Sequence, residues 1–402
     1  MDINHVVSTC LETYGNFYLY DESVIIANIT RLKKNFPQVH FLYSLKCNPN
    51  ANILCSIFTQ GFGADAASAG EVELAHEVGL PADAIYYSAP GKSMNDIKNT
   101  IGKSVLIADS IDEIKRIQTI AEQAGTVINI GIRINPNFSF SGEDGMPSKF
   151  GIDEDQALSF LRENSCNNIK VIGIHVHLKS QELRGNVLAA YYQRMFRLAE
   201  KFEQVCGNLN FVNMGSGMGI PYATKDAPLD VAALGSAFQK ELDRYRVAHP
   251  HTKIMIEVGR YAVCQSGIYV TRVLDRKISH GRTYLILKNT LNGFIRPSLA
   301  QLISHYSAEG TPMGAEPLFT AKDAFDFLTL KDIAPFETVT LVGNLCTNTD
   351  VIAENICLPH LECDDAVIIT NAGSYAAVLS PMQFSSQNKP KELFLSQTGE
   401  IV

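Results

Sequence analysis

Reactive side chains recur in this sequence directly after short apolar runs. Lys46 follows "HFLYSL", His177 ends "VIGIHVH", and Glu257 ends "KIMIE". An amine, an imidazole and a carboxylate are the groups that enzymes use for nucleophilic attack and proton transfer. Each of these residues, taken alone, has an ordinary structural explanation. Their repeated occurrence at the ends of apolar runs is what indicates a functional site. Further polar residues at the ends of such runs are Asp65, Asp109, Arg133, Asn135, the glycines of "GSGMG" (215–219) and Arg260.

The runs that carry these residues predict a barrel of parallel strands over residues 24–268. Short β-rich runs alternate there with stretches of helical period, which is typical of βα units. Eight strands in roughly 240 residues fit a (β/α)8 barrel, in which the carboxyl ends of all strands meet at one face. An open doubly wound sheet is the alternative, but no GxGxxG follows the first strand. The eight runs are "FLYSL", "GADAA", "AIYYS", "SVLIAD", "INIGIRIN", "VIGIHVH", "NFVNMG" and "KIMIEVG".

The rest of the chain predicts a second, all-β domain made of residues 1–23 and 269–402. β-branched runs such as "SGIYVTRVL" and "ETVTLVGNLC" follow residue 268 without long helical patterns. The N-terminal "NFYLYD" is expected to add a strand to this domain. The polar, irregular segment 306–327 is expected to be a surface excursion.

Composition restricts the class of partner. The chain has 402 residues and a formal charge of −8, which argues against a nucleic-acid or acidic-membrane surface and favours small-molecule ligands. No apolar run reaches the roughly 20 residues of a membrane span, and "MDINHVVSTCLETYG" has no apolar core, so we expect a cytoplasmic protein. Nine cysteines without CxxC pairs suggest neither a disulfide framework nor a metal site, and we expect most of them to be buried.

One cofactor chemistry accounts for the residues at the strand ends. Lys46 could form a Schiff base with an aldehyde, provided that burial and neighbouring cations lower the pKa of its amine. Glycine-loop N–H groups from "GSGMG", which a helical pattern follows, could bind a phosphate. Glu257 could keep a pyridine nitrogen protonated, while His177 packs flat against the ring. Together these features imply pyridoxal 5′-phosphate.

The ordered motifs resemble the alanine-racemase-like (fold type III) pyridoxal-phosphate decarboxylases, a family that includes diaminopimelate and ornithine decarboxylases. The resemblance extends over nearly the whole chain. Its motifs are "YSLKCN", "GADAASAGEVELA", "IRINPN", "SKFGI", "GIHVHLKSQ", "NMGSGMGIPY", "IEVGR", "RPSL", "GNLCTNTD" and "NAGSY".

The resemblance implies roles for individual residues. Lys46 would carry the cofactor, His177 would stack on its ring and Glu257 would pair with its nitrogen. Cys346 would be the proton donor, supplied by the partner subunit of a homodimer with shared active sites. The other cofactor contacts would be Asp65, Arg133, Ser180, Gly215, Gly217, Gly259, Arg260 and Tyr375. The substrate contacts would be Arg296, Thr347 and Asp350.

Departures from the family pattern concern the substrate. Thr347 stands where related decarboxylases have an acid, and "RPSLA" ends in Ala300 where diaminopimelate decarboxylases have Tyr. Lys179 replaces a glycine in "HLKSQ". "APGK" (89–92) and "LCTNTD" resemble the branch that acts on amino-acid centres within larger molecules, such as citryl-diaminopropionate or amino acids linked to an acyl carrier protein.

Three alternatives remain at this stage. Diaminopimelate decarboxylase of lysine biosynthesis is one. A racemase is another, although alanine racemases place an arginine, not a carboxylate, at the pyridine nitrogen. The third is a regulatory homologue that binds the cofactor without activity, which would be expected to lack Lys46 or Cys346.

Overall fold

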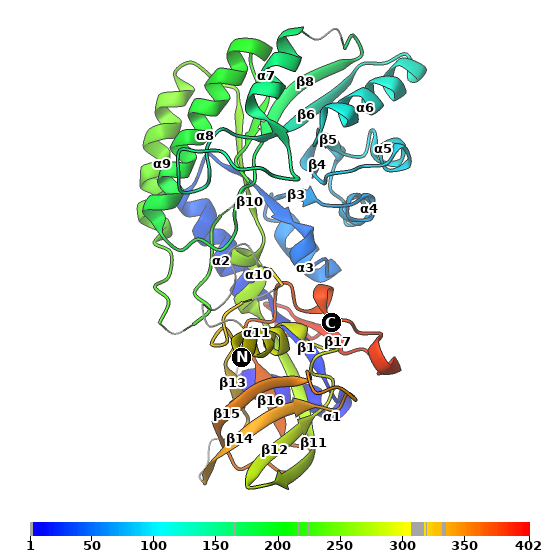
Figure 1. The fold of residues 1–402 in the computed structure, drawn as a ribbon, viewed down its shortest axis with the longest axis vertical. Coiled ribbons are helices and arrows are strands. Elements are labelled where there is room, and N and C mark those ends of the chain that lie inside the picture. Colours follow the sequence, from blue (N-terminus) through cyan, green and yellow to red (C-terminus); the bar gives the residue numbers. More distant parts are fainter. Residues whose placement is uncertain are drawn as a thin grey trace. The chain divides into compact units, whose positions relative to one another are not determined.

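The computed structural model describes residues 3–163, 166–215, 217–223, 225–306, 317–318, 320–331 and 335–402 (Figure 1). The predicted surface excursion lies partly outside the described residues, at 307–316 and 319. The chain divides into two compact units. The barrel unit comprises residues 28–220 and 228–259, and the sheet unit comprises residues 1–27, 221–227 and 260–402.

The barrel unit is built on a closed ring of eight parallel strands, as the sequence predicts (Figure 1). The order around the ring is β5-β4-β3-β2-β10-β9-β8-β6, and pairing of β5 with β6 closes it, which excludes an open sheet. The strands are β2 (His40–Ser44), β3 (Gly63–Ala66), β4 (Ile85–Tyr87), β5 (Val105–Ala108), β6 (Ile128–Asn135), β8 (Ile169–His175), β9 (Phe211–Asn213) and β10 (Lys253–Val258). A short strand, β7 (Ile152–Asp153), adds to β6.

Helices between the strands cover the outside of the ring. They are α2 (Glu22–Asn35, beginning in the sheet unit), α3 (Ala51–Phe58), α4 (Ala69–Glu77), α5 (Met94–Thr100), α6 (Ile111–Ala124), α7 (Glu154–Glu163), α8 (Gly185–Cys206) and α9 (Val231–Arg246). Three of them begin at a serine that caps the helix: the hydroxyl of Ser68, Ser93 and Ser110 accepts the backbone N–H of the residue three positions on. These caps fix where each chain segment turns away from the end of its strand.

An apolar layer fills the interior of the ring. Phe211 on β9 occupies its middle, and the glycines at 131 and 173 make room for its ring. A Cβ atom at Gly173 would lie 2.5 Å from ring atoms of Phe211, so no larger residue fits there. The layer therefore makes the barrel a packed core and not a pore. Its other side chains are those of Leu42, Tyr86, Ile107 and Met255.

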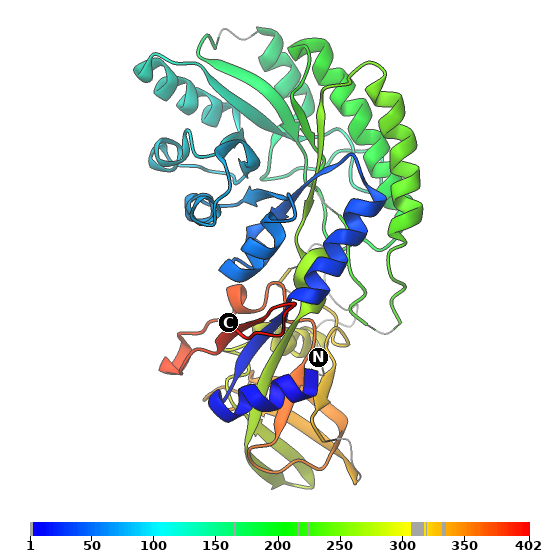
Figure 2. The same cartoon turned by 180° about the vertical axis from the view of Figure 1, so that it is seen from behind.

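The sheet unit contains an eight-stranded sheet, and the predicted N-terminal strand is part of it. β1 (Phe17–Asp21) pairs antiparallel with β11 (Gly267–Ser279) and parallel with β17 (Lys391–Leu395). The remaining strands are β12 (Arg282–Leu287), β13 (Phe327–Thr329), β14 (Phe336–Gly343), β15 (Val351–Pro359) and β16 (Ala366–Ile369). Figure 2 shows α1 (Ile3–Thr13, dark blue) lying across this sheet, where its apolar residues pack against those of β1, β11, β16 and β17.

The prediction that this domain is all-β is wrong in one respect. Besides α1 and the short α10 (Arg260–Val263), the unit contains α11 (Ile295–Tyr306), which includes the "RPSL" motif. Arg296 and Ala300, and likewise Pro297 and Gln301, are buried four residues apart, which is the spacing of one helix face. None of the described helices is long and apolar enough to cross a membrane.

Candidate active site

A layer of buried polar side chains lies directly above the apolar layer. Each strand of the ring contributes one residue, either its own or, for β4 and β5, the residue that directly follows the strand. This residue comes two positions after the one that contributes to, or leaves space in, the apolar layer. Because side chains alternate along a strand, residues two apart face the same side, here the barrel interior. The polar layer consists of Ser44, Asp65, Ser88, Asp109, Arg133, His175, Asn213 and Glu257, all of them buried.

Lys46 lies two positions beyond Ser44, on the 3-10 turn that follows β2. Its side chain is 41% exposed, and its Nζ is 3.5 Å from Oδ2 of Asp65. The charge of Asp65 raises the pKa of Lys46, and this effect outweighs burial and the nearby Arg133, which both lower it. The expectation of a lowered pKa is therefore wrong for the protein by itself: the amine is held as an ammonium by its carboxylate neighbour.

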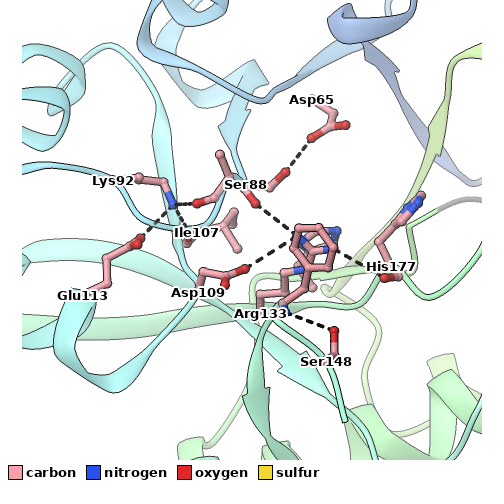
Figure 3. Close-up of polar contacts among 12 residues, drawn as sticks. Asp65, Ser88, Lys92, Ile107, Asp109, Glu113, Arg133, Ser148 and His177 are labelled. Carbon is pink, nitrogen blue, oxygen red and sulfur yellow. Dashed lines mark hydrogen bonds and ion pairs between the residues drawn. The ribbon is translucent and has the colours of Figure 1, made fainter. Parts of the chain in front are cut away.

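Asp65 is held in place by two hydroxyl groups of the polar layer. Its Oδ2 accepts a hydrogen bond from Ser44 at 2.9 Å. Its Oδ1 accepts one from Ser88 at 2.7 Å (Figure 3). Both carboxylate oxygens therefore have fixed partners, and the position of the charge that faces Lys46 is defined.

Arg133 joins three strand ends across the layer (Figure 3). Its guanidinium lies 3.6 Å from Asp109 and donates to the backbone oxygens of Ser88 and His177 at 3.4 Å each. The ring of Phe150 packs against the guanidinium, 4.4 Å from its central carbon. Arg133 is thus a rigid cation beside the lysine–aspartate pair.

Behind this layer, Lys92 and Glu113 form an ion pair that is inaccessible to solvent. The ammonium of Lys92 donates to Glu113 at 2.7 Å and to the backbone oxygens of Ala89 and Ile107 at 2.6 and 2.7 Å, so all three N–H groups are satisfied (Figure 3). Ala89 follows β4 and Ile107 belongs to β5. Lys92 therefore joins the ends of these strands beyond Tyr87, where their backbone pairing stops.

Glu257 is surrounded by donors. Its Oε1 lies 2.9 Å from Nε2 of His175 and accepts a hydrogen bond from Asn213, also at 2.9 Å. Its Oε2 lies 3.2 Å from Nδ1 of His177. Burial alone would raise the pKa of Glu257, but His175 and His177 lower it well below its usual value. Burial lowers the pKa of His177, although Glu257 opposes this shift. The carboxylate is therefore ionised and can pair with a cationic group of a ligand.

The glycines after β9 form a closely packed turn. Gly215 has φ +62°, and a Cβ atom there would overlap the backbone oxygen of Val176. A Cβ atom at Gly217 would lie 2.7 Å from the ring of Phe140, while Ser216 is outside the described residues. The helix that the sequence predicts after this motif is α9, which begins only at Val231. An anion bound at this turn would meet its backbone N–H groups and not the N-terminus of α9.

The preceding loop is tied to this turn. Glu182 donates its backbone N–H to Gly217 at 2.7 Å and accepts that of Gly219 at 3.0 Å. Its carboxylate binds Lys179 at 3.0 Å and Arg184 at 2.7 Å, and chiefly the hydrogen bond with Arg184 lowers the pKa of Glu182 to about 2. The unusual Lys179 thus has a local counter-ion. Ser180, predicted as a phosphate contact, lies half-buried in the same loop.

Gly259 follows β10 and belongs to the same unit. A Cβ atom there would overlap the sulfur of Cys47, next to Lys46. Only glycine permits this approach between the first and last strands of the barrel.

In the sheet unit, two predicted arginines share one tyrosine. The hydroxyl of Tyr222 accepts hydrogen bonds from Arg260 at 2.8 Å and from Arg296 at 3.2 Å. The guanidinium of Arg260 also lies 5.3 Å from the ring centre of Tyr375, whose φ of +54° is unusual for a bulky residue. Arg296 is fully buried beside Phe325. Tyr222 was not among the predicted site residues, although it closes the motif "GSGMGIPY".

Cys346 lies on a short loop between β14 and β15, and its side chain is exposed. The loop is organised by Asp350, which is 2% exposed and accepts hydrogen bonds from the N–H groups of Leu345 and Leu291 at 3.0 Å each and from the hydroxyl of Thr290. Thr347 bonds to Thr349 at 2.9 Å. The expectation that most cysteines are buried is wrong: three of the nine are buried and four are exposed.

Sequence analysis identified residues at the ends of the strands, but it missed several that lie two positions earlier on the same strands. His175, Asn213 and Ser44 each precede a predicted site residue by two positions. Counting back two positions from each strand end would have found them, because residues two apart face the same side.

Residues 22–264 match the family model described as "Pyridoxal-dependent decarboxylase, pyridoxal binding domain". The chain belongs to this family. It is 30% identical over 396 residues to the L-glutamyl-[BtrI acyl-carrier protein] decarboxylase of Niallia circulans, covering 94% of this chain and 88% of the relative. It is 29% identical over 394 residues to the diaminopimelate decarboxylase of Thermoplasma acidophilum, covering 96% of this chain and 88% of the relative.

Solved structures agree with this assignment. The diaminopimelate decarboxylase of Helicobacter pylori, complexed with L-lysine, superposes with a TM-score of 0.82 at 27% identity, covering 98% of this chain and 95% of that chain. The lysine/ornithine decarboxylase of Vibrio vulnificus shares the fold, with a TM-score of 0.78 at 22% identity and coverage of 98% of both chains. This protein is a pyridoxal-phosphate-dependent decarboxylase, and the fold type III resemblance is confirmed.

Proposed function

We propose that the polar layer and Lys46 bind pyridoxal phosphate and that the protein removes the carboxylate from an amino-acid centre of a larger molecule. The observation that carries this is the grouping of one accessible lysine, a buried carboxylate with three donors, and a glycine turn at one end of the barrel unit. When bound, the cofactor offers an aldehyde to an amine and a protonated ring that withdraws electrons from the bond to the departing carboxylate.

The barrel unit fits this cofactor residue by residue. Lys46 supplies the amine, and the charge of Asp65, 3.5 Å away, keeps that amine protonated until it loses a proton to solvent and can attack. Oε2 of Glu257 holds the ring nitrogen in its protonated state, and the half-exposed His177 covers one face of the ring. Arg133, which lies on β6 and pairs with Asp109 after β5, orients the ring.

Each unit contains residues that are predicted to contact the phosphate. In the barrel unit they are the backbone of Gly215 and Gly217 and the hydroxyl of Ser180, with Gly259 allowing the close approach of β10. In the sheet unit the predicted phosphate contacts are Arg260 and Tyr375, and their mutual contact supports a shared role.

The sheet unit supplies the proton donor and the substrate contacts. Cys346, on its exposed loop, protonates the carbon that loses the carboxylate, and it acts in the site of a partner subunit within a homodimer. Arg296 and Thr347 contact the substrate. The hydrogen bonds of Asp350 support a different role from the predicted one: it holds the cysteine loop in shape.

Thr347 and Ala300, two departures from the family pattern, support the choice of substrate class. Thr347 cannot neutralise a distal ammonium, and Ala300 provides no phenol, so a free diamino acid lacks its expected partners. The 30% identity to a decarboxylase of a carrier-linked glutamyl group supports a conjugated substrate instead. Diaminopimelate decarboxylation remains the second candidate because of the relatives at similar identity. A cytoplasmic location stays a prediction.

Two measurements test the proposal. Borohydride reduction and peptide mapping should place the pyridoxyl label on Lys46, and a label elsewhere would refute the cofactor site. Carbon dioxide release should then be compared for free glutamate, lysine and meso-diaminopimelate and for glutamate thioesters of phosphopantetheine and a carrier protein. Turnover of free diaminopimelate alone would replace the conjugate hypothesis, and no turnover despite labelling would favour a regulatory homologue.

A further inference from the structure

His175 and Asn213 are buried members of the polar layer to which the proposed function gives no individual role. They are 1% and 0% exposed and stand opposite each other in register on the neighbouring strands β8 and β9. Both contact Glu257 on β10, the next strand of the ring. Buried polar side chains destabilise a protein unless they are hydrogen-bonded. Two such side chains that contact the same carboxylate therefore indicate a specific role.

The two oxygens of Glu257 have different surroundings. Oε1 lies within 2.9 Å of both His175 Nε2 and Asn213 Nδ2, two groups that solvent does not reach. Oε2 faces His177, whose side chain is 22% exposed and therefore lies on the open side of the layer. Oε1 is therefore bound by buried side chains, whereas Oε2 faces the side of the layer that a ligand can reach.

The amide of Asn213 can have only one orientation. Its Oδ1 accepts the backbone N–H of Gly215 at 2.9 Å, so its NH2 group must face Glu257. The backbone N–H of Glu257 in turn donates to the oxygen of Gly215 at 2.7 Å. A single side chain thus links the carboxylate to the first glycine of the turn that is assigned to the phosphate.

We propose that His175 and Asn213 are positioning residues that hold Oε1 of Glu257 and so present Oε2 to the ring nitrogen of pyridoxal phosphate. This inference rests on the proposed function, in which Glu257 meets that nitrogen. Without the two donors the carboxylate would be free to rotate and to pair with His177 through either oxygen, and the ring nitrogen would lose an aligned acceptor.

The test compares pyridoxal phosphate with its 1-deaza analogue, which has a C–H in place of the ring nitrogen, in binding to the full-length apo-protein. Wild-type protein should prefer pyridoxal phosphate. His175→Phe should reduce that preference about tenfold, the scale of one hydrogen bond to a charged group, while binding of the analogue changes little. His175→Gln, which restores an N–H donor, should recover most of the preference. His249→Phe, which removes a partly exposed histidine that pairs with the buried Glu203, is the control and should leave the preference unchanged.

The outcomes separate this inference from the function on which it rests. If wild-type protein binds both ligands equally, the role of Glu257 is wrong and the proposed function fails with it. If wild-type protein discriminates and His175→Phe discriminates equally well, only the positioning role is refuted. If His175→Phe does not fold, as judged by the absence of a melting transition, Asn213→Ala takes its place. It is expected to lose the preference as well, and an unchanged preference would refute the inference.

Discussion

Before cofactor binds, the state of Lys46 depends on one carboxylate. Asp65 lies 3.5 Å away and is held by Ser44 and Ser88, so its charge cannot move aside. A raised pKa keeps the amine protonated at neutral pH, and an ammonium cannot attack an aldehyde. The residue that orients Lys46 therefore also slows its first reaction.

Asp65→Asn should speed the loading of pyridoxal phosphate onto apo-protein at neutral pH. Removing the carboxylate lowers the pKa of Lys46, so a larger fraction of the amine is free at each pH below that pKa. In wild-type protein the loading rate should rise steadily from pH 7 to 9, and the variant should be faster throughout. Stopped-flow absorbance measures both rates. A slower variant with the same pH dependence would show that Asp65 is needed for orientation and does not suppress the amine.

Glu257→Gln should retain bound cofactor but lose roughly 10²-fold or more in kcat, the scale of one well-placed electrostatic partner. The amide preserves size but cannot hold a ring nitrogen in its protonated state. Cofactor content and steady-state rates measure the two effects. Glu203→Gln is the matched control, because Glu203 is also buried and lies 2.7 Å from His249, but it is not part of the polar layer. A native rate in Glu257→Gln would mean that another group protonates the ring.

At the scale of elements, the strands of the barrel were predictable because buried parallel strands read as short apolar runs. Lys46, His177 and Glu257 stood out because a charge or an imidazole ends such a run. Ser88 and Asn213 did not stand out, because their roles depend on partners on other strands. The sequence of one strand does not show those partners. The helix α11 was missed because a proline and a serine interrupt its apolar pattern, although proline is tolerated in a first turn.

Lys92 joins the ends of β4 and β5, and its removal should be costly. Burial lowers the pKa of Lys92 and raises that of Glu113, so the environment opposes both charges, which persist only as a pair. Lys92→Met leaves the carboxylate with only the partly exposed Arg116, 4.0 Å away, and should destabilise the protein by about 3–5 kcal/mol. Lys92→Met with Glu113→Leu should recover most of that loss in urea unfolding, since apolar residues can replace a buried pair. If the double variant is less stable than the single one, the pair is not what stabilises these strand ends.

At the scale of the molecule, the residues that are assigned to the reaction are distributed over two compact units. Lys46, His177 and Glu257 belong to the barrel unit, whereas Cys346 and Arg296 belong to the sheet unit. The sequence predicts that Cys346 serves the site of a partner subunit, and this requires a homodimer in which neither chain has a complete site by itself.

Mixing Lys46→Ala with Cys346→Ala, each inactive alone, should therefore restore activity. A mixed dimer has one site that lacks both groups and one site that has both. With random pairing and two equal sites, recovery should approach about a quarter of the native rate under the two-fold symmetry usual for homo-oligomers. Subunit exchange is verified first by native mass spectrometry of differently tagged chains, with a mixture of Lys46→Ala and wild-type protein as the control for exchange losses. If exchange occurs and the mixture stays inactive, Cys346 acts within its own chain and the shared site is refuted. Activity in Cys346→Ala alone would instead remove the thiol from the reaction.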